Sequence, residues 1–320
     1  MTNTETLNLV CTLQEPYKDA EITQISSAYD GRLVVLWRDS KGEQEECRVY
    51  EKSGDYQSMS FSAFPGPVDY VVPMPKNRWL GCVCRVPYED GKPLPDGAWI
   101  ISDRGQVLST SNMGKALLCP VVAQDGTIWA PYWDEYEWRD DRVVDEESDY
   151  GKYTAGCTGM TVFDDHLKVI GRHDSPTFAL EIYASHHDGR TFWYLSYGEW
   201  VIDSWGPKGQ GQPMPANDDL QLVGAPFLIY KDRLARLGNI ARDYERNRKP
   251  EGYVSLYRYP PSDNPATPTK VNIEDIRQTV LVYPDMRPVS MDDFISSWGN
   301  KFYLVDHSQH WYELEAFPDC

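Results

Sequence analysis

Short apolar runs paired around two-residue polar turns recur along the chain. In the clearest copy, residues 120–133, an apolar run ends at Asp125-Gly126 and an aromatic-rich run begins at once. Asp-Gly between two such runs is a strong hairpin signal, because glycine accepts a positive φ without steric cost. The pattern therefore predicts antiparallel hairpins that repeat through the sequence.

Six such hairpins can be placed, each with strand-like sequence after it. Their turns lie at positions 30, 77, 125, 188, 232 and 299, which are 47, 48, 63, 44 and 67 residues apart. Units of this length with four short strands each are typical of a β-propeller, in which small sheets are arranged radially. Residues 33–37 and 128–133 are continuously apolar, as expected for strands covered on both faces by neighbouring sheets.

The chain thus resembles β-propeller repeat proteins in general, although it carries no named repeat signature. The resemblance covers nearly all of residues 1–320 and implies one all-β domain with six blades. Seven blades are an alternative. A helix inserted near residues 232–247 is another, because Leu234, Leu237 and Ala241 recur at helical spacing. Strand is favoured there, since 233–237 matches the place of 32–36 in the first unit.

Closure of the ring is predicted from the two ends of the chain. The last unit lacks an outer strand, and residues 7–13 form a strand-like segment with no partner beside them. Pairing the two would cover two edges that otherwise stay open. We therefore predict that the N-terminal strand completes the last blade.

Charge narrows the possible partners. The chain has 49 acids against 31 bases and a formal net charge of -18, so it repels phosphate backbones and favours a basic partner. It lacks both a secretion signal and a run of ~18 apolar residues, which predicts no membrane span. The odd number of irregularly spaced cysteines predicts a reduced, cytoplasmic protein. The cysteines are Cys11, Cys47, Cys82, Cys84, Cys119, Cys157 and Cys320.

An acidic insertion at residues 134–155 departs most from the repeat. It separates the second and third strands of the third unit, and residues 134–150 hold nine carboxylates and two basic residues. Two other long loops are expected at 206–217 and 260–270. A charge run is often only a solvated loop, but interleaved aromatic residues supply contact energy where carboxylates supply steering.

The insertion is therefore the predicted docking site for a partner. A calcium loop is disfavoured, because the acids lack the fixed spacing and the central glycine of that motif. The predicted partner-binding residues are Trp133, Asp134, Glu135, Tyr136, Glu137, Trp138, Asp140, Asp141, Asp145, Glu146, Glu147 and Tyr150.

No catalytic residue, metal ligand or cofactor is predicted. His186 and His187 invite a metal reading, but adjacent residues on a strand point to opposite faces and cannot easily bind one ion together. A role in the turn at Asp188-Gly189 is expected instead. Elbow-type nucleophile motifs and glycine-rich phosphate loops are absent.

The preferred hypothesis is a non-catalytic binding protein that docks a basic protein through loops on one propeller face. By charge and architecture the chain weakly resembles bacterial toxin-immunity proteins, which implies an inhibitor of a toxin enzyme. One alternative is a hydrolase or lyase acting on a sugar or small molecule at the central channel. Another is a protein-interaction scaffold.

Overall fold

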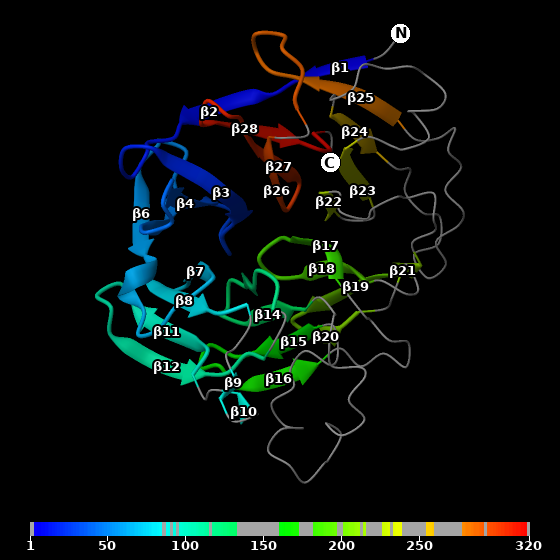
Figure 1. The fold of residues 1–320 in the computed structure, drawn as a ribbon. Helices are drawn as coiled ribbons and strands as arrows, with labels where there is room; N and C mark the ends of the chain where they lie inside the picture. The colour runs from blue at the N-terminus through cyan, green and yellow to red at the C-terminus, as the bar shows by residue number, and fades with distance from the viewer. Residues whose placement is uncertain are drawn as a thin grey trace.

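The computed structural model shows small antiparallel sheets arranged in a ring (Figure 1). It describes residues 3–84, 88–89, 92–93, 96–114, 117–132, 160–172, 182–196, 201–211, 214–215, 226–230, 233–238, 254–258, 277–290 and 293–318. Within these ranges six sheets of four or five strands surround one axis, beside a two-stranded hairpin. The chain is a six-bladed β-propeller.

Blades 1 to 3 follow one another along the chain. Blade 1 contains β3 (Ala20–Ser27), β4 (Leu33–Asp39), β5 (Glu45–Tyr50) and β6 (Tyr56–Ser60), followed by the short helix η1 (Phe61–Ala63). Blade 2 contains β7 (Tyr70–Met74), β8 (Arg78–Cys82), β11 (Ala98–Ser102) and β12 (Val107–Ser111). The hairpin of β9 (Tyr88–Glu89) and β10 (Lys92–Pro93) lies between β8 and β11. Blade 3 contains β13 (Val121–Val122), β14 (Ile128–Pro131), β15 (Met160–Phe163) and β16 (Val169–Arg172).

Blades 4 to 6 complete the ring and include both of the N-terminal strands. Blade 4 contains β17 (Ile182–His187), β18 (Phe192–Ser196), β19 (Val201–Gly206), β20 (Gly209–Gln210) and β21 (Met214–Pro215). Blade 5 contains β22 (Phe227–Tyr230), β23 (Arg233–Gly238), β24 (Ser255–Arg258), β25 (Arg277–Val282) and β1 (Asn3–Thr6). Blade 6 contains β26 (Phe294–Trp298), β27 (Lys301–Val305), β28 (His310–Glu315) and β2 (Asn8–Thr12).

The predicted closure is confirmed. β2 pairs antiparallel with β28, which makes it the outer strand of the last blade. Leu7 and Leu13 on either side of β2 are buried, and Gln14 O accepts hydrogen bonds from Arg48 Nη1 and Tyr50 Oη of blade 1. The sequence did not predict β1, which pairs parallel with β25 and so joins the N-terminus to blade 5 as well.

The alternatives to a six-bladed ring are wrong within the described residues. Residues 233–238 form strand β23, paired with both β22 and β24, whereas 239–250 lie outside the described ranges. The predicted loop 206–217 contains β20 and β21, which both pair with β19. Because β23 lies between β22 and β24, its backbone N–H and C=O groups bond to both neighbouring strands, and they satisfy the partners' groups in turn.

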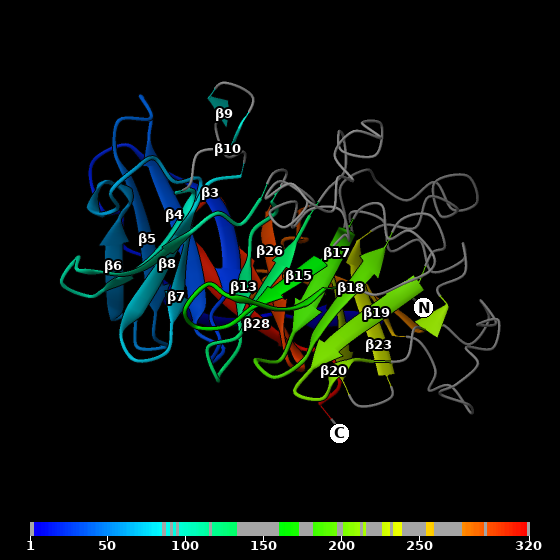
Figure 2. The same cartoon turned by 90° about the horizontal axis from the view of Figure 1, so that it is seen from below.

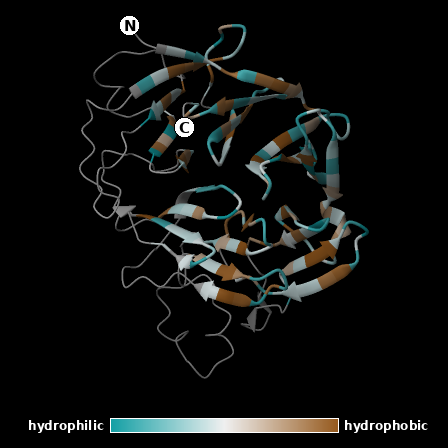
Figure 3. Cartoon of the chain, turned by 180° about the vertical axis from the view of Figure 1, so that it is seen from behind, coloured by the Kyte–Doolittle hydropathy of each residue, from teal (hydrophilic) through white to brown (hydrophobic). Residues whose placement is uncertain are grey.

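Apolar side chains fill the spaces between neighbouring blades. One cluster joins blades 5 and 6, another joins blades 2 and 3, and a third joins blades 1 and 2. Figure 3 shows hydrophobic colours mainly on the strands and hydrophilic colours on the turns between them. Each blade therefore needs its neighbours to bury both faces, which explains the continuous apolar runs of the inner strands.

The two faces of the ring carry different connections. Turns between the first and second strands of each blade form the hairpin face; they include Asp125-Gly126 and Asp188-Gly189, where the glycines have φ of 94° and 82°. The ends of β14 and β15 lie on the opposite face, which we call the insertion face. The β9–β10 hairpin also projects from that face in Figure 2.

Candidate functional site

The predicted partner-binding residues, 133–150, lie outside the described residues, as do 260–270. The structure does describe where the acidic insertion leaves and rejoins the fold. Pro131 of β14 is paired directly with Met160 of β15, and both sheet ends are buried. The insertion is thus attached at two adjacent points of one rigid blade, on the insertion face.

Buried polar side chains meet at the axis, where β3, β17, β22 and β26 come together; we call this region the hub. His187 Nε2 lies 2.8 Å from Ser27 Oγ, and His186 Nδ1 lies 3.0 Å from Ser297 Oγ. The two serine hydroxyls donate onward, Ser27 to Ser297 O at 3.0 Å and Ser297 to Phe227 O at 2.9 Å. One chain of hydrogen bonds therefore links four blades.

This arrangement determines the tautomers of the neutral histidines. Each serine hydroxyl donates its proton to a backbone carbonyl, so it can only accept a hydrogen bond from its histidine. His187 is then protonated on Nε2 and His186 on Nδ1. The remaining nitrogens, His187 Nδ1 and His186 Nε2, are buried and have no close hydrogen-bond partner among the described residues.

Burial keeps both histidines neutral. Loss of solvent lowers the pKa of His187 to about 4 and, with the neighbouring His187, holds the pKa of His186 well below its ordinary value. Charging either ring would place an unpaired cation among aromatic neighbours, because His186 stacks on Trp193 at 5.3 Å. The hub is accordingly suited to holding blades together with uncharged hydrogen bonds.

The expected turn role of these histidines is wrong. β17 extends through His187, and the turn begins at Asp188, whose Oδ1 accepts the Arg190 and Thr191 N–H groups. The two rings do point to different neighbours, as strand geometry predicts. The sequence did not predict the roles of Ser27 and Ser297, because no local pattern indicates which distant strand supplies the hydrogen-bond partner of a histidine.

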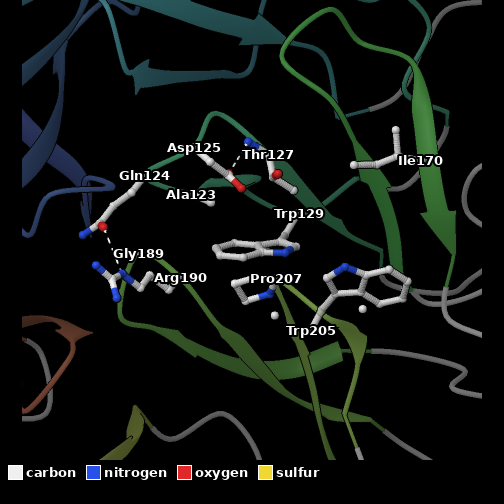
Figure 4. Close-up of a pocket in the computed structure, with 12 residues that line it drawn as sticks. Ala123, Gln124, Asp125, Thr127, Trp129, Ile170, Gly189, Arg190, Trp205 and Pro207 are labelled. Atoms are coloured by element: carbon white, nitrogen blue, oxygen red, sulfur yellow. Dashed lines mark hydrogen bonds between the residues drawn. The ribbon is translucent and has the colours of Figure 1, made fainter.

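A pocket of about 740 Å³ opens on the hairpin face between blades 3 and 4 (Figure 4); we call it the groove. It runs from the inner turns of the two blades to their outer strands. Its lining consists of Ala123, Gln124, Asp125, Thr127, Trp129, Ile170, Gly189, Arg190, Trp205, Gly206, Pro207 and Gly209.

Two tryptophans form the walls of the groove. Trp129 is 1% exposed and stacks on Phe192 of blade 4 with ring centroids 5.5 Å apart. Trp205 of blade 4 lies against Gly171 of blade 3, where an added Cβ would come within 2.4 Å of the indole. Aromatic packing across the blade boundary therefore makes these walls rigid.

The polar rim comes from the two inner turns. Asp125 Oδ1 accepts the Thr127 N–H at 2.9 Å and shapes its own turn. Gln124 N donates to Gly189 O at 2.7 Å, which fixes the two turns against each other. Arg190 Nε lies 3.4 Å from Gln124 Oε1. None of these groups was singled out from the sequence, although both turns were predicted.

Within the described residues, no group of three or more His, Cys, Asp or Glu side chains is placed to hold a metal ion. The same part of the chain contains no helix with the length and apolar character needed to cross a membrane. His307 and His310 flank the β27–β28 turn, where Asp306 accepts the His310 N–H.

No family model matches the chain, and no curated protein sequence matches it. Solved structures with a similar fold include a streptogramin B lyase, 9% identical, with a TM-score of 0.44 over 96% of each chain. A catalytically inactive virginiamycin B lyase from Staphylococcus aureus with quinupristin is 9% identical, with a TM-score of 0.48 over 95% of this chain and 98% of that one. A putative gluconolactonase is 12% identical, with a TM-score of 0.37 over 97% of each chain. At these values the likeness is one of fold alone and says nothing of activity.

Proposed function

We propose that the chain is a non-catalytic binding protein that docks a basic protein through the acidic insertion. The observation that carries this proposal is the attachment of the insertion at Pro131 and Met160, which are paired in one blade. Residues 134–150 carry a net charge of -7, from nine acids and two bases, out of -18 for the whole chain. A large share of the net negative charge thus belongs to one insertion that is attached to blade 3.

Such an arrangement suits capture of a cationic surface. A concentrated negative field accelerates encounter with a basic partner, and the effect weakens as salt shortens the Debye length to about 10 Å at 0.1 M. Tyr136, Trp138 and Tyr150 supply side chains of the kind that dominate binding energy once contact is made. The most concrete form of the proposal is a cytoplasmic immunity protein that blocks a basic toxin enzyme.

The test compares two variants with the same net charge. One carries Asp140→Asn, Asp141→Asn, Glu146→Gln and Glu147→Gln; the control carries four changes at exposed acids on strands and turns elsewhere. The control changes are Glu21→Gln, Glu43→Gln, Asp103→Asn and Glu315→Gln. Association is measured by surface plasmon resonance with purified, positively charged products of the neighbouring genes, at low and high salt.

We expect the insertion variant to slow association at low salt by about tenfold, whereas the control changes it less than about twofold. The difference should shrink at high salt, where exposed charges are screened. Equal association rates for both variants, or no cationic binder among these products, would contradict the proposal. A complex containing several different partners at once would instead favour a scaffold.

A hydrolase or lyase is the second candidate, and the hub is the observation that favours it. His186 and His187 are neutral and each keeps one unprotonated ring nitrogen. A neutral imidazole is the form that accepts a proton in general-base catalysis, and a substrate would have to reach the buried ring and offset the charge it then gains. A screen with chromogenic esters and glycosides decides: turnover that disappears in both His186→Asn and His187→Gln, with the fold retained, would support an enzyme.

A further inference from the structure

The groove between blades 3 and 4 has the features of a separate ligand site. It lies on the hairpin face, whereas the strand ends that support the acidic insertion lie on the insertion face. Its volume of about 740 Å³ is within the usual range for pockets that take small molecules, ~300–1,000 Å³. Its walls are fixed by packing across the blade boundary, so the shape exists before any ligand arrives.

Two indoles line this space. The Trp129 Nε1–H is itself buried and has no acceptor among the described residues, whereas the Trp205 side chain is half-buried. Other buried indoles of the described residues also lack an acceptor, but Trp37, Trp298 and Trp311 do not line the groove. The Trp205 indole is therefore the one of the two with side-chain surface left for a ligand, and its N–H can donate to an acceptor oxygen.

Arg190 adds a positive charge at the inner end. Several arginines of the described residues pair with carboxylates, as Arg78 does with Asp165 at 3.0 Å and Arg32 with Asp30 at 2.8 Å, whereas no ion pair holds Arg190 or the exposed Arg104 of blade 2 within this part of the chain. Arg190 is exposed, its nearest hydrogen-bond acceptor is the Gln124 amide oxygen at 3.4 Å, and no described carboxylate forms an ion pair with it. In a chain with 18 more acids than bases, a guanidinium left open beside a pocket indicates an anionic ligand group.

Acceptors and further hydroxyl-binding groups complete the rim. Within the part of the chain that the structure describes, the second carboxylate oxygen of Asp125 and the Thr127 hydroxyl make no hydrogen bond, and Figure 4 shows both side chains next to the Trp129 ring. The Gln124 amide, a donor and acceptor, lies beside Arg190 in the same view. Alternating donors and acceptors match hydroxyl groups, because each hydroxyl both donates and accepts.

We propose that the groove binds a sugar ring that carries a carboxylate, of the uronic acid class. Arg190 pairs with the carboxylate, and Asp125, Thr127 and the indole N–H of Trp205 bind the hydroxyl and ring oxygens. The aromatic walls cover the apolar C–H faces of the ring. A simple carboxylate would leave most of the groove empty, and a neutral sugar would leave Arg190 without a partner.

Isothermal titration calorimetry of the complete chain with glucuronate, galacturonate, glucose and acetate tests the proposal. We expect at least one uronate to bind about tenfold or more tightly than both glucose and acetate, because only a uronate uses both halves of the groove. Acetate binding equal to that of the uronates would reduce the site to a general anion site and overturn the proposal. Tighter binding of glucose, or no binding of any probe at millimolar concentration, would overturn it too.

Two variants locate the binding. Arg190→Gln should weaken uronate binding about tenfold while leaving glucose unchanged, because a charge-assisted pair is lost. Arg104→Gln is the matched control, an exposed arginine in the β11–β12 turn of blade 2. Trp205→Phe removes the N–H together with part of the ring that packs on Gly171, so affinity should fall, and the melting temperature measured beside it separates lost packing from a lost hydrogen bond. Equal losses in Arg190→Gln and Arg104→Gln would contradict the placement in the groove.

Discussion

The hub and the groove share one hairpin and use it in opposite ways. His187, at the end of β17, is buried and hydrogen-bonds within a chain of serine hydroxyls, whereas Arg190, three residues later, is exposed and has no carboxylate partner among the described residues. The hub pairs its two serine hydroxyls and one nitrogen of each histidine internally, and it excludes charge. The groove leaves donors and a charge open. Polar groups that hydrogen-bond to one another stabilise the fold. Polar groups without a protein partner can instead form hydrogen bonds with a ligand and so contribute to the free energy of binding.

Glycine at the tip of this hairpin makes the two environments compatible. Gly189 has a φ of 82°, and an added Cβ would lie 2.3 Å from Tyr29 O of blade 1. The turn can therefore approach the axis closely on one side while Gly189 also lines the groove. Only glycine combines this backbone conformation with so close an approach.

Removal of the N-terminal closing strand should lower the stability of the protein most, because it opens the ring whose blades the hub connects. A deletion of residues 1–14 removes β2, the buried Leu7 and Leu13, and the Gln14 carbonyl that accepts from Arg48 and Tyr50. Loss of two buried leucines alone removes about 4 kcal/mol, so we expect the melting temperature to fall by roughly 10 °C in a calorimetric scan.

The control for this deletion removes residues 1–6 only. It takes away β1 but keeps Leu7 and β2, so its melting temperature should remain much closer to that of the complete chain. If the two deletion variants melt at the same temperature, pairing of β2 with β28 adds no stability to the ring. The boundary between blades 6 and 1 would then be no weaker than the boundary between blades 3 and 4, where the groove lies.

Ser297→Ala should destabilise the hub by a smaller amount. The change leaves the buried His186 N–H without an acceptor and deprives Phe227 O of a donor, at a cost of about 1–3 kcal/mol in the free energy of unfolding. Ser296→Ala is the matched control, since the neighbouring serine is only half buried and its side chain makes no hydrogen bond to another described residue. Urea denaturation measures both; equal values would show that the hydroxyl chain adds no stability.

The repeat was readable from the sequence because its signals are local. Turns such as Asp125-Gly126 and apolar runs such as 33–37 act over a few residues, so the six hairpins and the closing strand could be predicted. The hub and the groove could not. Ser27 and His187 are 160 residues apart, and Trp205 meets Gly171 only after two blades pack. Such pairs depend on how strands are aligned across the ring, which no short pattern specifies.

Acid should weaken the hub while leaving the groove almost unaffected. The pKa of His187 is about 4 in the folded protein and near its ordinary value of 6.5 when unfolded. Between these values the unfolded chain binds more protons, so the free energy of unfolding rises with pH and falls as pH is lowered through this window. From pH 7 to pH 5 we expect His187 alone to account for a loss of ~2 kcal/mol.

His187→Gln isolates that contribution, because glutamine can donate to Ser27 Oγ but does not titrate. Urea denaturation at pH 7 and pH 5 should show a shallower loss of stability in His187→Gln than in the parent, whereas Arg190→Gln should follow the parent closely. His186, whose pKa burial also lowers, adds to the loss in the parent and in Arg190→Gln, and adds less in His187→Gln because the neighbouring His187 no longer lowers its pKa. If His187→Gln lost as much stability as the parent between these two pH values, His187 would be able to take up its proton without leaving the hub. The hub would then not exclude charge, and its contrast with the open groove on the same hairpin would be wrong.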